Sequence, residues 1–153
     1  MEVTSTLTRL PPIFSGETKP CRGRMIWYVA AGSALGGMAR YLLAGWAQLA
    51  VDSTFPLGTL VVNIAGSFLL GFILRYTMDL AGMSTETRAF LTIGFCGGFT
   101  TFSTFSYEAL ALLQEGQWSR AGIYIMSSVA VSLAATLAGL AVAQQILMHA
   151  RQA

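Results

Sequence analysis

The stretch Gly94-Phe-Cys-Gly-Gly-Phe-Thr-Thr-Phe-Ser-Thr-Phe105 decides the fold of this chain. It lies mid-way along a segment without charge, from Ala89 to Tyr107, which as a whole is compatible with lipid. Gly97-Gly98 and Thr100-Thr101 nevertheless make poor helix, because glycine loosens the backbone and hydroxyls compete for its hydrogen bonds. In hydrocarbon, an interrupted helix survives only where it is buried in protein or lines a polar cavity. The stretch therefore predicts a helix broken at mid-membrane depth, with a functional site at the break.

The composition is typical of a membrane protein rather than a soluble domain. Of the 153 residues, 54% are apolar and 10% are charged, whereas charged residues make up about 25% of an ordinary soluble domain. Four apolar segments are each near the roughly 20 residues that a bilayer-spanning helix needs. They run over Ile26–Leu49, Leu57–Met78, Ala89–Leu113 and Ala121–Leu147. The sequence thus predicts an all-α membrane protein with four transmembrane helices, the third of them broken.

The first 24 residues differ from the rest. They contain three prolines and four basic residues without an apolar run, which predicts a disordered tail before a transmembrane domain over residues 25–153. The tail is not a signal peptide, because it has no apolar core. Met25 stands where the first apolar segment starts, so either it is the true initiator or the tail is dispensable.

Basic residues bear on the orientation of the chain in the membrane. With the tail, seven would lie on one side (Arg9, Lys19, Arg22, Arg24, Arg75, Arg88 and Arg151) against Arg120 on the other. Such an excess would place the amino end in the cytoplasm. Without the tail, only Arg75, Arg88 and Arg151 oppose Arg120, and this weak bias permits insertion in both orientations.

Motifs for chemistry on a substrate are missing from the sequence. It has no phosphate loop or nucleophile motif, and its one histidine, His149, is at the carboxyl end. Cys21 lies in the tail and Cys96 within the third apolar segment, so we expect no disulfide between them. We therefore expect neither an enzyme nor a haem or transition-metal site, and no nucleic-acid partner.

Polar residues interrupt the first two apolar segments. Gly32 and Gly36 form a pair that lets two helices approach closely. Arg40 is costly inside a membrane. It is either a structural arginine, which snorkels to the interface or pairs with carbonyls, or a charge that attracts anions to a vestibule. In the second segment Thr59, Asn63 and Ser67 share one helical face. Asn63 either bonds to another helix or offers its NH2 group to a passing anion.

The last two segments carry hydroxyls and aromatic rings. Tyr124, Ser128, Ser132 and Thr136 recur every four residues, so their hydroxyls either replace part of an anion's hydration shell or hold helices together. Phe102 and Phe105 lie three apart after the break. They either pack or turn their electropositive ring edges toward a pathway. Glu108 follows near the membrane face, where we expect it to be solvated or paired.

At these residues the chain resembles the Fluc (CrcB) family of small bacterial fluoride channels. The resemblance covers essentially everything after Met25, and its segments are 36–41, 55–67, 94–105 and 124–136. It implies a multi-pass protein of the bacterial inner membrane. It also implies an antiparallel, dual-topology homodimer in lipid, with two fluoride pores.

The resemblance also implies roles for individual residues. Pore residues would be Asn63, Phe102, Phe105 and Thr59, with Tyr124, Ser128, Ser132 and Thr136 as a polar track. Arg40 matches the family's arginine of the first span. A central Na⁺ would be held by the backbone carbonyls of Gly97 and Thr100 from each subunit.

Three hypotheses for the function follow. The first is a passive channel that exports cytoplasmic fluoride down its electrochemical gradient. The second is a proton-coupled exporter of the small-multidrug type, which would need a buried carboxylate where the first span offers Arg40. The third is a structural subunit whose polar stripes only hold helices together.

Overall fold

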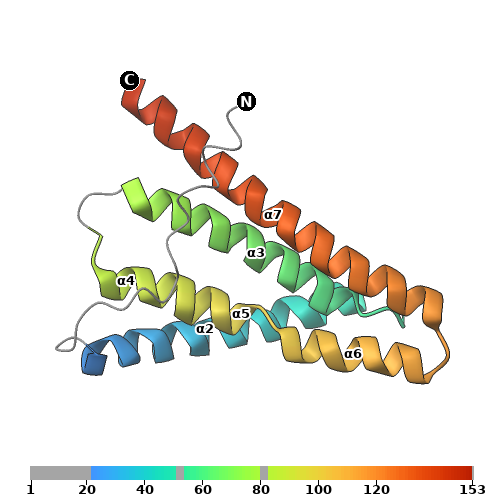
Figure 1. The fold of residues 1–153 in the computed structure, drawn as a ribbon. Coiled ribbons are helices and arrows are strands. Elements are labelled where there is room, and N and C mark those ends of the chain that lie inside the picture. Colours follow the sequence, from blue (N-terminus) through green and yellow to red (C-terminus); the bar gives the residue numbers. More distant parts are fainter. Residues whose placement is uncertain (1–21, 51–53, 80–82, 153) are drawn as a thin grey trace.

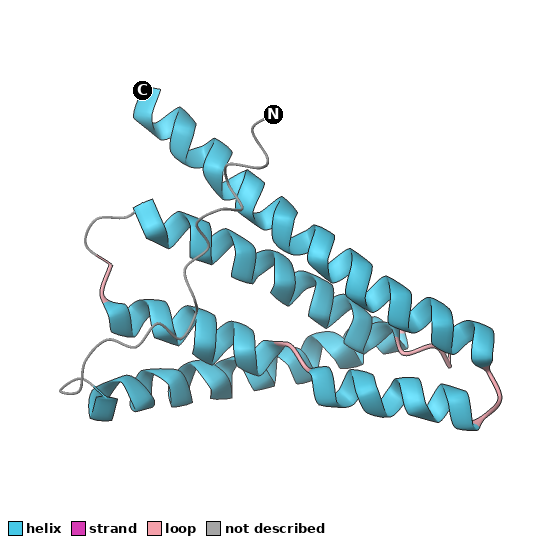
Figure 2. Cartoon of the chain, in the orientation of Figure 1, coloured by secondary structure: helices cyan, strands magenta, loops and turns pink. Residues whose placement is uncertain are grey.

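Every regular element in the described part of the chain is a helix (Figure 2). The protein is described from a computed structural model, which covers residues 22–50, 54–79 and 83–152. Three long helices are continuous: α2 (Arg22–Leu49), α3 (Leu57–Asp79) and α7 (Trp118–Gln152). The remaining path consists of α4 (Thr85–Ala89), the π-helical η1 (Phe90–Cys96), α5 (Gly97–Phe99) and α6 (Phe102–Gln114). The four predicted helical segments are therefore confirmed, and the third is interrupted as expected.

The helices extend further than the apolar segments that predicted them. The third path begins at Thr85 rather than Ala89, because the Ser84 hydroxyl accepts a hydrogen bond from the Thr87 N–H at 3.1 Å and caps the first turn. α2 begins at Arg22, so residues 22–24 of the predicted tail are helical. Arg24 pairs there with Glu86 of α4 at 3.4 Å. The rest of the predicted tail, including Cys21, lies outside the described residues.

The bundle is assembled from two closely packed helix pairs. α3 packs mainly on α7, and α2 runs along η1 and α5 (Figure 1). A Cβ atom on Gly32 would lie 2.4 Å from the Phe90 carbonyl oxygen, and one on Gly36 would lie 2.2 Å from that of Phe95. Neither position has room for a side chain. The interpretation of this glycine pair as a site of close helix approach is confirmed.

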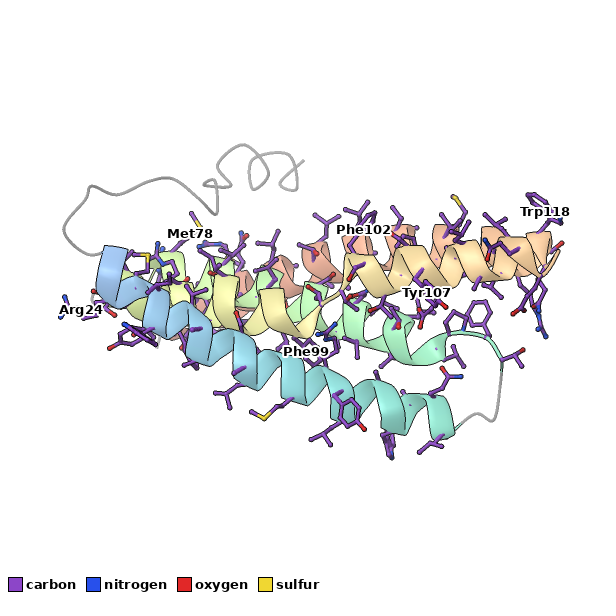
Figure 3. The ribbon with its side chains drawn as sticks, turned by 90° about the horizontal axis from the view of Figure 1, so that it is seen from below. Arg24, Met78, Phe99, Phe102, Tyr107 and Trp118 are labelled. Atoms are coloured by element: carbon purple, nitrogen blue, oxygen red, sulfur yellow. The ribbon has the colours of Figure 1, made fainter. Side chains whose placement is uncertain are left out.

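The outer surface of the bundle is strongly apolar. Leu57–Met78 and Trp118–Gln152 are long and apolar enough to cross a membrane. Trp27, Trp46 and Trp118, all close to helix ends, are each at least 69% exposed, and Figure 3 shows Trp118 at the far end of the bundle. Tryptophan is enriched at such positions in membrane proteins, where the ring lies at the level of the lipid headgroups. These features suit a protein surrounded by lipid.

Candidate functional site

The helix break lies at Thr100 and Thr101. Both residues have extended backbone, with φ −84° and ψ 160° at Thr100 and φ −151° and ψ 114° at Thr101. The predicted break is confirmed, but the prediction that Gly97-Gly98 helps to open it is wrong, since both glycines are helical in α5. A Cβ atom on Gly98 would lie 2.6 Å from the Ser33 carbonyl oxygen, so this glycine permits close packing on α2.

Asn63 of α3 holds the broken backbone in place. Its Oδ1 accepts a hydrogen bond from the Thr101 N–H at 2.8 Å, and its Nδ2 donates to the Thr101 carbonyl at 3.1 Å. The Thr101 hydroxyl in turn accepts from the Thr104 N–H at 3.2 Å and caps α6. Of the two interpretations of Asn63, the bond to another helix is therefore present. The second N–H of the amide leaves its predicted role as an anion donor open.

The break also changes the surroundings of two backbone carbonyls. In a continuous helix, the N–H of Thr101 would bond to the Gly97 carbonyl and that of Thr104 to the Thr100 carbonyl. Here the Thr101 N–H bonds to Asn63, and the Thr104 N–H bonds to the Thr101 hydroxyl. Both carbonyls thus lose their helical donors at the carboxyl end of α5, where the helix dipole is negative.

A cavity of about 490 Å³ adjoins the break. Six predicted pore residues line it, together with Gly97 and Thr100: these six are Asn63, Phe102, Phe105, Ser128, Ser132 and Thr136. The Thr136 hydroxyl donates to the Ser132 carbonyl of its own helix at 3.1 Å. In contrast, the hydroxyl oxygens of Ser128 and Ser132 are buried without a hydrogen-bond partner among the described residues. A buried hydroxyl without a partner is costly, so these two are available to a ligand.

The other two predicted pore residues, Thr59 and Tyr124, meet at Glu108. The Tyr124 hydroxyl donates to Glu108 Oε2 at 2.7 Å, and the Thr59 hydroxyl donates to Oε1 at 2.9 Å. Tyr124 is fully buried, and its ring centroid lies 5.4 Å from that of Phe105. Glu108 is therefore paired, as one of the two expectations had it. Phe105 links this polar cluster to the cavity, because it lines the cavity and its ring contacts that of Tyr124.

Arg40 lies apart from these groups. It belongs to α2, does not line the cavity, and its side chain makes no hydrogen bond or ion pair within the described ranges. Arg40 is partly buried, whereas Phe102 is the exposed residue among the predicted pore residues, with 78% of its surface exposed. Figure 3 shows its ring on the outside of the bundle, beside the break.

Most of the bundle matches one known family. The family described as "CrcB-like protein, Camphor Resistance (CrcB)" matches residues 27–140. This chain belongs to the CrcB-like family. A relative from Geobacter metallireducens, named "Fluoride-specific ion channel FluC", is 47% identical over 118 residues, which cover 77% of this chain and 95% of the relative. Relatives of the same name from Geobacter sulfurreducens and Rhizobium meliloti are each 48% identical to this chain. The matched segments cover 95% and 93% of these two relatives. The resemblance drawn from the motifs is confirmed.

Three features of this CrcB-like chain were not predicted for the site. η1 is a π-helix, in which the Gly97 N–H bonds back to the carbonyls of Thr92 and Gly94; such turns occur frequently at functional sites. Glu108 is the acceptor on which Thr59 and Tyr124 converge. Phe55 packs edge-on against Tyr124, with 5.6 Å between ring centroids and 86° between ring planes. The spacing of acidic and aromatic residues along the chain gave no signal for the last two contacts.

Proposed function

We propose that this CrcB-like protein is a fluoride-selective passive channel that exports fluoride down its electrochemical gradient. The observation that carries the proposal is the pair of buried, unpartnered hydroxyls, Ser128 and Ser132, in a cavity at a helix break. The names of the relatives support the choice of ion. Such a protein is a channel and not an enzyme.

The physical requirement is to replace the water around a small anion. Fluoride is strongly hydrated, so a dry apolar path would impose a large desolvation penalty. The hydroxyls of Ser128 and Ser132 and the remaining N–H of Asn63 would act as donors. The rings of Phe102 and Phe105, whose centroids lie 5.4 Å apart, would present electropositive edges. The amino end of α6 adds a positive helix dipole at the same place.

The proton-coupled exporter is not favoured by this geometry. Such a carrier would use a buried carboxylate that is free to exchange a proton for a cation. The carboxylate of Glu108 instead accepts hydrogen bonds from Thr59 and Tyr124. Beyond its first turn, α2 carries one charged residue, Arg40. Its positive charge would repel cationic compounds.

We infer that two copies assemble as an antiparallel, dual-topology homodimer in lipid. In this arrangement all four helical paths span the bacterial inner membrane, and each dimer holds two pores. The support is the 78% exposure of Phe102, a residue that also lines the cavity. A second copy seated over this side would enclose the cavity. Arg40, which has no partner among the described residues, would serve as a vestibule charge in the dimer.

Na⁺ at the centre of this dimer fits the residues at the break. Na⁺ is a hard cation, and unwound backbone carbonyls at the carboxyl ends of broken helices suit it. The Gly97 and Thr100 carbonyls have this character, because their helical donors bond elsewhere. Two carbonyls from each subunit would supply four oxygens. The ion would add positive charge close to the anion path and join the two subunits.

The test is fluoride efflux from liposomes that contain the purified protein. We expect rapid, potential-driven release of fluoride without release of chloride. The Ser128→Ala/Ser132→Ala double variant should release fluoride more slowly while eluting as a folded protein. Ser127→Ala is the matched control, because the Ser127 hydroxyl bonds to the Tyr124 carbonyl of its own helix at 3.2 Å and does not line the cavity. Intact protein that leaves fluoride trapped would refute the proposal.

A further inference from the structure

The segment that enters α3 is tied to two other helices. Gln48, near the end of α2, donates from Nε2 to the Phe55 carbonyl at 3.1 Å and accepts from the Gly58 N–H at 3.2 Å. Arg120, in the first turns of α7, donates from Nη1 to the Thr54 hydroxyl at 3.0 Å. Two bonds to backbone and one to the Thr54 side chain thus tie the residues around Phe55 to α2 and α7. Fixing a connection in this way costs conformational entropy, so the placement of Phe55 has a structural or functional use.

What this placement achieves is a contact on Tyr124. The Phe55 ring lies perpendicular to the Tyr124 ring at a centroid distance of 5.6 Å, and Phe105 lies 5.4 Å from the same ring. Tyr124 is fully buried and has aromatic neighbours from both the connection and α6. Its hydroxyl points to Glu108, with an O···O distance of 2.7 Å. The position of this hydroxyl depends on where the ring is held.

We propose that Phe55 is a positioning residue for ion passage: it holds the Tyr124 ring so that its hydroxyl stays on Glu108. Gln48 acts one step further back by holding the Phe55 backbone. This inference rests on the proposed channel function. Edge-on aromatic contacts have a preferred geometry, and a tyrosine ring that loses one neighbour gains freedom to turn. The Tyr124 hydroxyl, which ends the polar track, would then move away from Glu108, and the passing anion would meet a misplaced hydroxyl.

The competing explanation is that Phe55 contributes packing alone. Phe55 does pack against the buried cluster that contains Phe105 and Tyr124, so its removal will cost some stability in either case. The two explanations differ in what happens when the Tyr124 hydroxyl is absent. A residue that acts through this hydroxyl has nothing left to position in Tyr124→Phe. A residue that only packs still contributes there, because the ring remains.

The experiment is a double-mutant cycle on fluoride efflux, measured per folded protein in liposomes. We expect Phe55→Leu to lower the rate about tenfold in the wild-type background and less than twofold in the Tyr124→Phe background. Gln48→Met should lower it about threefold and add nothing to Phe55→Leu. Gln48→Glu, which keeps an acceptor for the Gly58 N–H, should recover part of the loss. Gln114→Met, at an exposed position at the end of α6, is the matched control and should leave the rate unchanged.

Each result decides the matter. Equal losses from Phe55→Leu in both backgrounds would overturn the proposal, as would an unchanged rate in Phe55→Leu. If Phe55→Leu does not fold, the conservative Gln48→Met variant tests the same chain of contacts. An unchanged rate in Gln48→Met would then count against it. Failure of the wild-type protein to release fluoride is a separate outcome, because it refutes the channel function itself before any variant is compared.

Discussion

At the scale of single residues, Asn63 shows how a broken helix is tolerated inside an apolar protein. Thr101 is 8% exposed; its extended backbone takes its N–H out of the helical pattern, and its carbonyl stands at the amino end of α6. One side-chain amide satisfies both groups, because an amide carries a donor and an acceptor side by side. The break is therefore stable only with Asn63 opposite it, and any contact with an ion comes in addition.

Asn63→Leu should destabilise the protein by about 2–4 kcal/mol. The reason is that two buried backbone groups would lose their partners, at about 1–3 kcal/mol each. The free energy of unfolding in detergent measures the change. Ser67→Ala is a control on the same helix face, since the Ser67 side chain makes no hydrogen bond within the described ranges. Equal stability of the two variants would show that Asn63 does not hold the break.

Phe102 and Phe105 should respond differently to replacement by isoleucine. Both variants should reduce fluoride flux about three- to tenfold. This assumes that each ring edge stabilises the passing anion by about 0.5–1.5 kcal/mol, as in other aromatic contacts, and about 1.4 kcal/mol corresponds to a tenfold change. Phe105 is 9% exposed and packs on Tyr124, so Phe105→Ile should also lower the free energy of unfolding, by about 1–3 kcal/mol. Phe102 is exposed in the single chain, so Phe102→Ile should leave the free energy of unfolding unchanged. Efflux and unfolding, measured on the same preparations, check both statements; undiminished flux in both variants would rule out a role for the rings.

At the scale of elements, the pairing of helices depends on backbone-to-backbone contact. A Cβ atom on Gly139 of α7 would lie 2.2 Å from the Phe68 carbonyl oxygen of α3, and one on Gly71 would lie 2.3 Å from that of Thr136. Small residues drive association in membrane proteins because they let helices approach closely. This pairing also fixes the Ser128–Ser132 stretch of α7 relative to Asn63 on α3.

Gly139→Ala should therefore destabilise the α3–α7 pair by about 1–3 kcal/mol, the usual cost of overpacking. Gly122→Ala, on the same helix, is the matched control, because a Cβ atom there meets nothing within 4 Å. That change should be neutral or stabilising by up to about 1 kcal/mol, since alanine is the better helix former. Unfolding of both variants in detergent measures the difference. Equal changes in stability for the two variants would mean that the close contact at Gly139 does not stabilise the α3–α7 pair.

Sequence patterns predicted what depends on neighbours along the chain. Apolar length predicted the four helical paths, and the hydroxyls of Thr100 and Thr101 predicted the break. The patterns failed where the cause lies in another helix. Gly98 was assigned to the break although it serves the contact with Ser33. The bond between Thr59 and Glu108 joins residues 49 positions apart, and its existence depends on how α3 and α6 pack.

At the scale of the whole molecule, the amino-terminal tail conflicts with the proposed dimer. An antiparallel pair needs both orientations, whereas the tail adds four basic residues to one side. Removing residues 1–24 takes away Arg24 and its ion pair with Glu86. The Arg24 side chain is 71% exposed, so this is a surface pair. Such surface pairs contribute about 0–1 kcal/mol. A chain that begins at Met25 should therefore keep its fold and its fluoride efflux; inserted protein that has lost transport would contradict this.

The same truncation should change orientation. Ser119→Cys, at an exposed position in the first turn of α7, reports the side of the membrane on which the α6–α7 connection lies. Cys96 is 2% exposed and will not compete for an impermeant maleimide, while Cys21→Ser removes the remaining thiol from the full-length chain. In cells, about half of the molecules that begin at Met25 should be labelled from outside, because their basic residues are nearly balanced. With the tail present, the amino end is held in the cytoplasm, so the connection after α6, three spans further on, lies outside in every molecule and labelling should approach completion. Chains inserted in this uniform way would not form the antiparallel dimer. Half labelling of both proteins would mean that the tail does not direct insertion, and uniform labelling of both would exclude the antiparallel dimer.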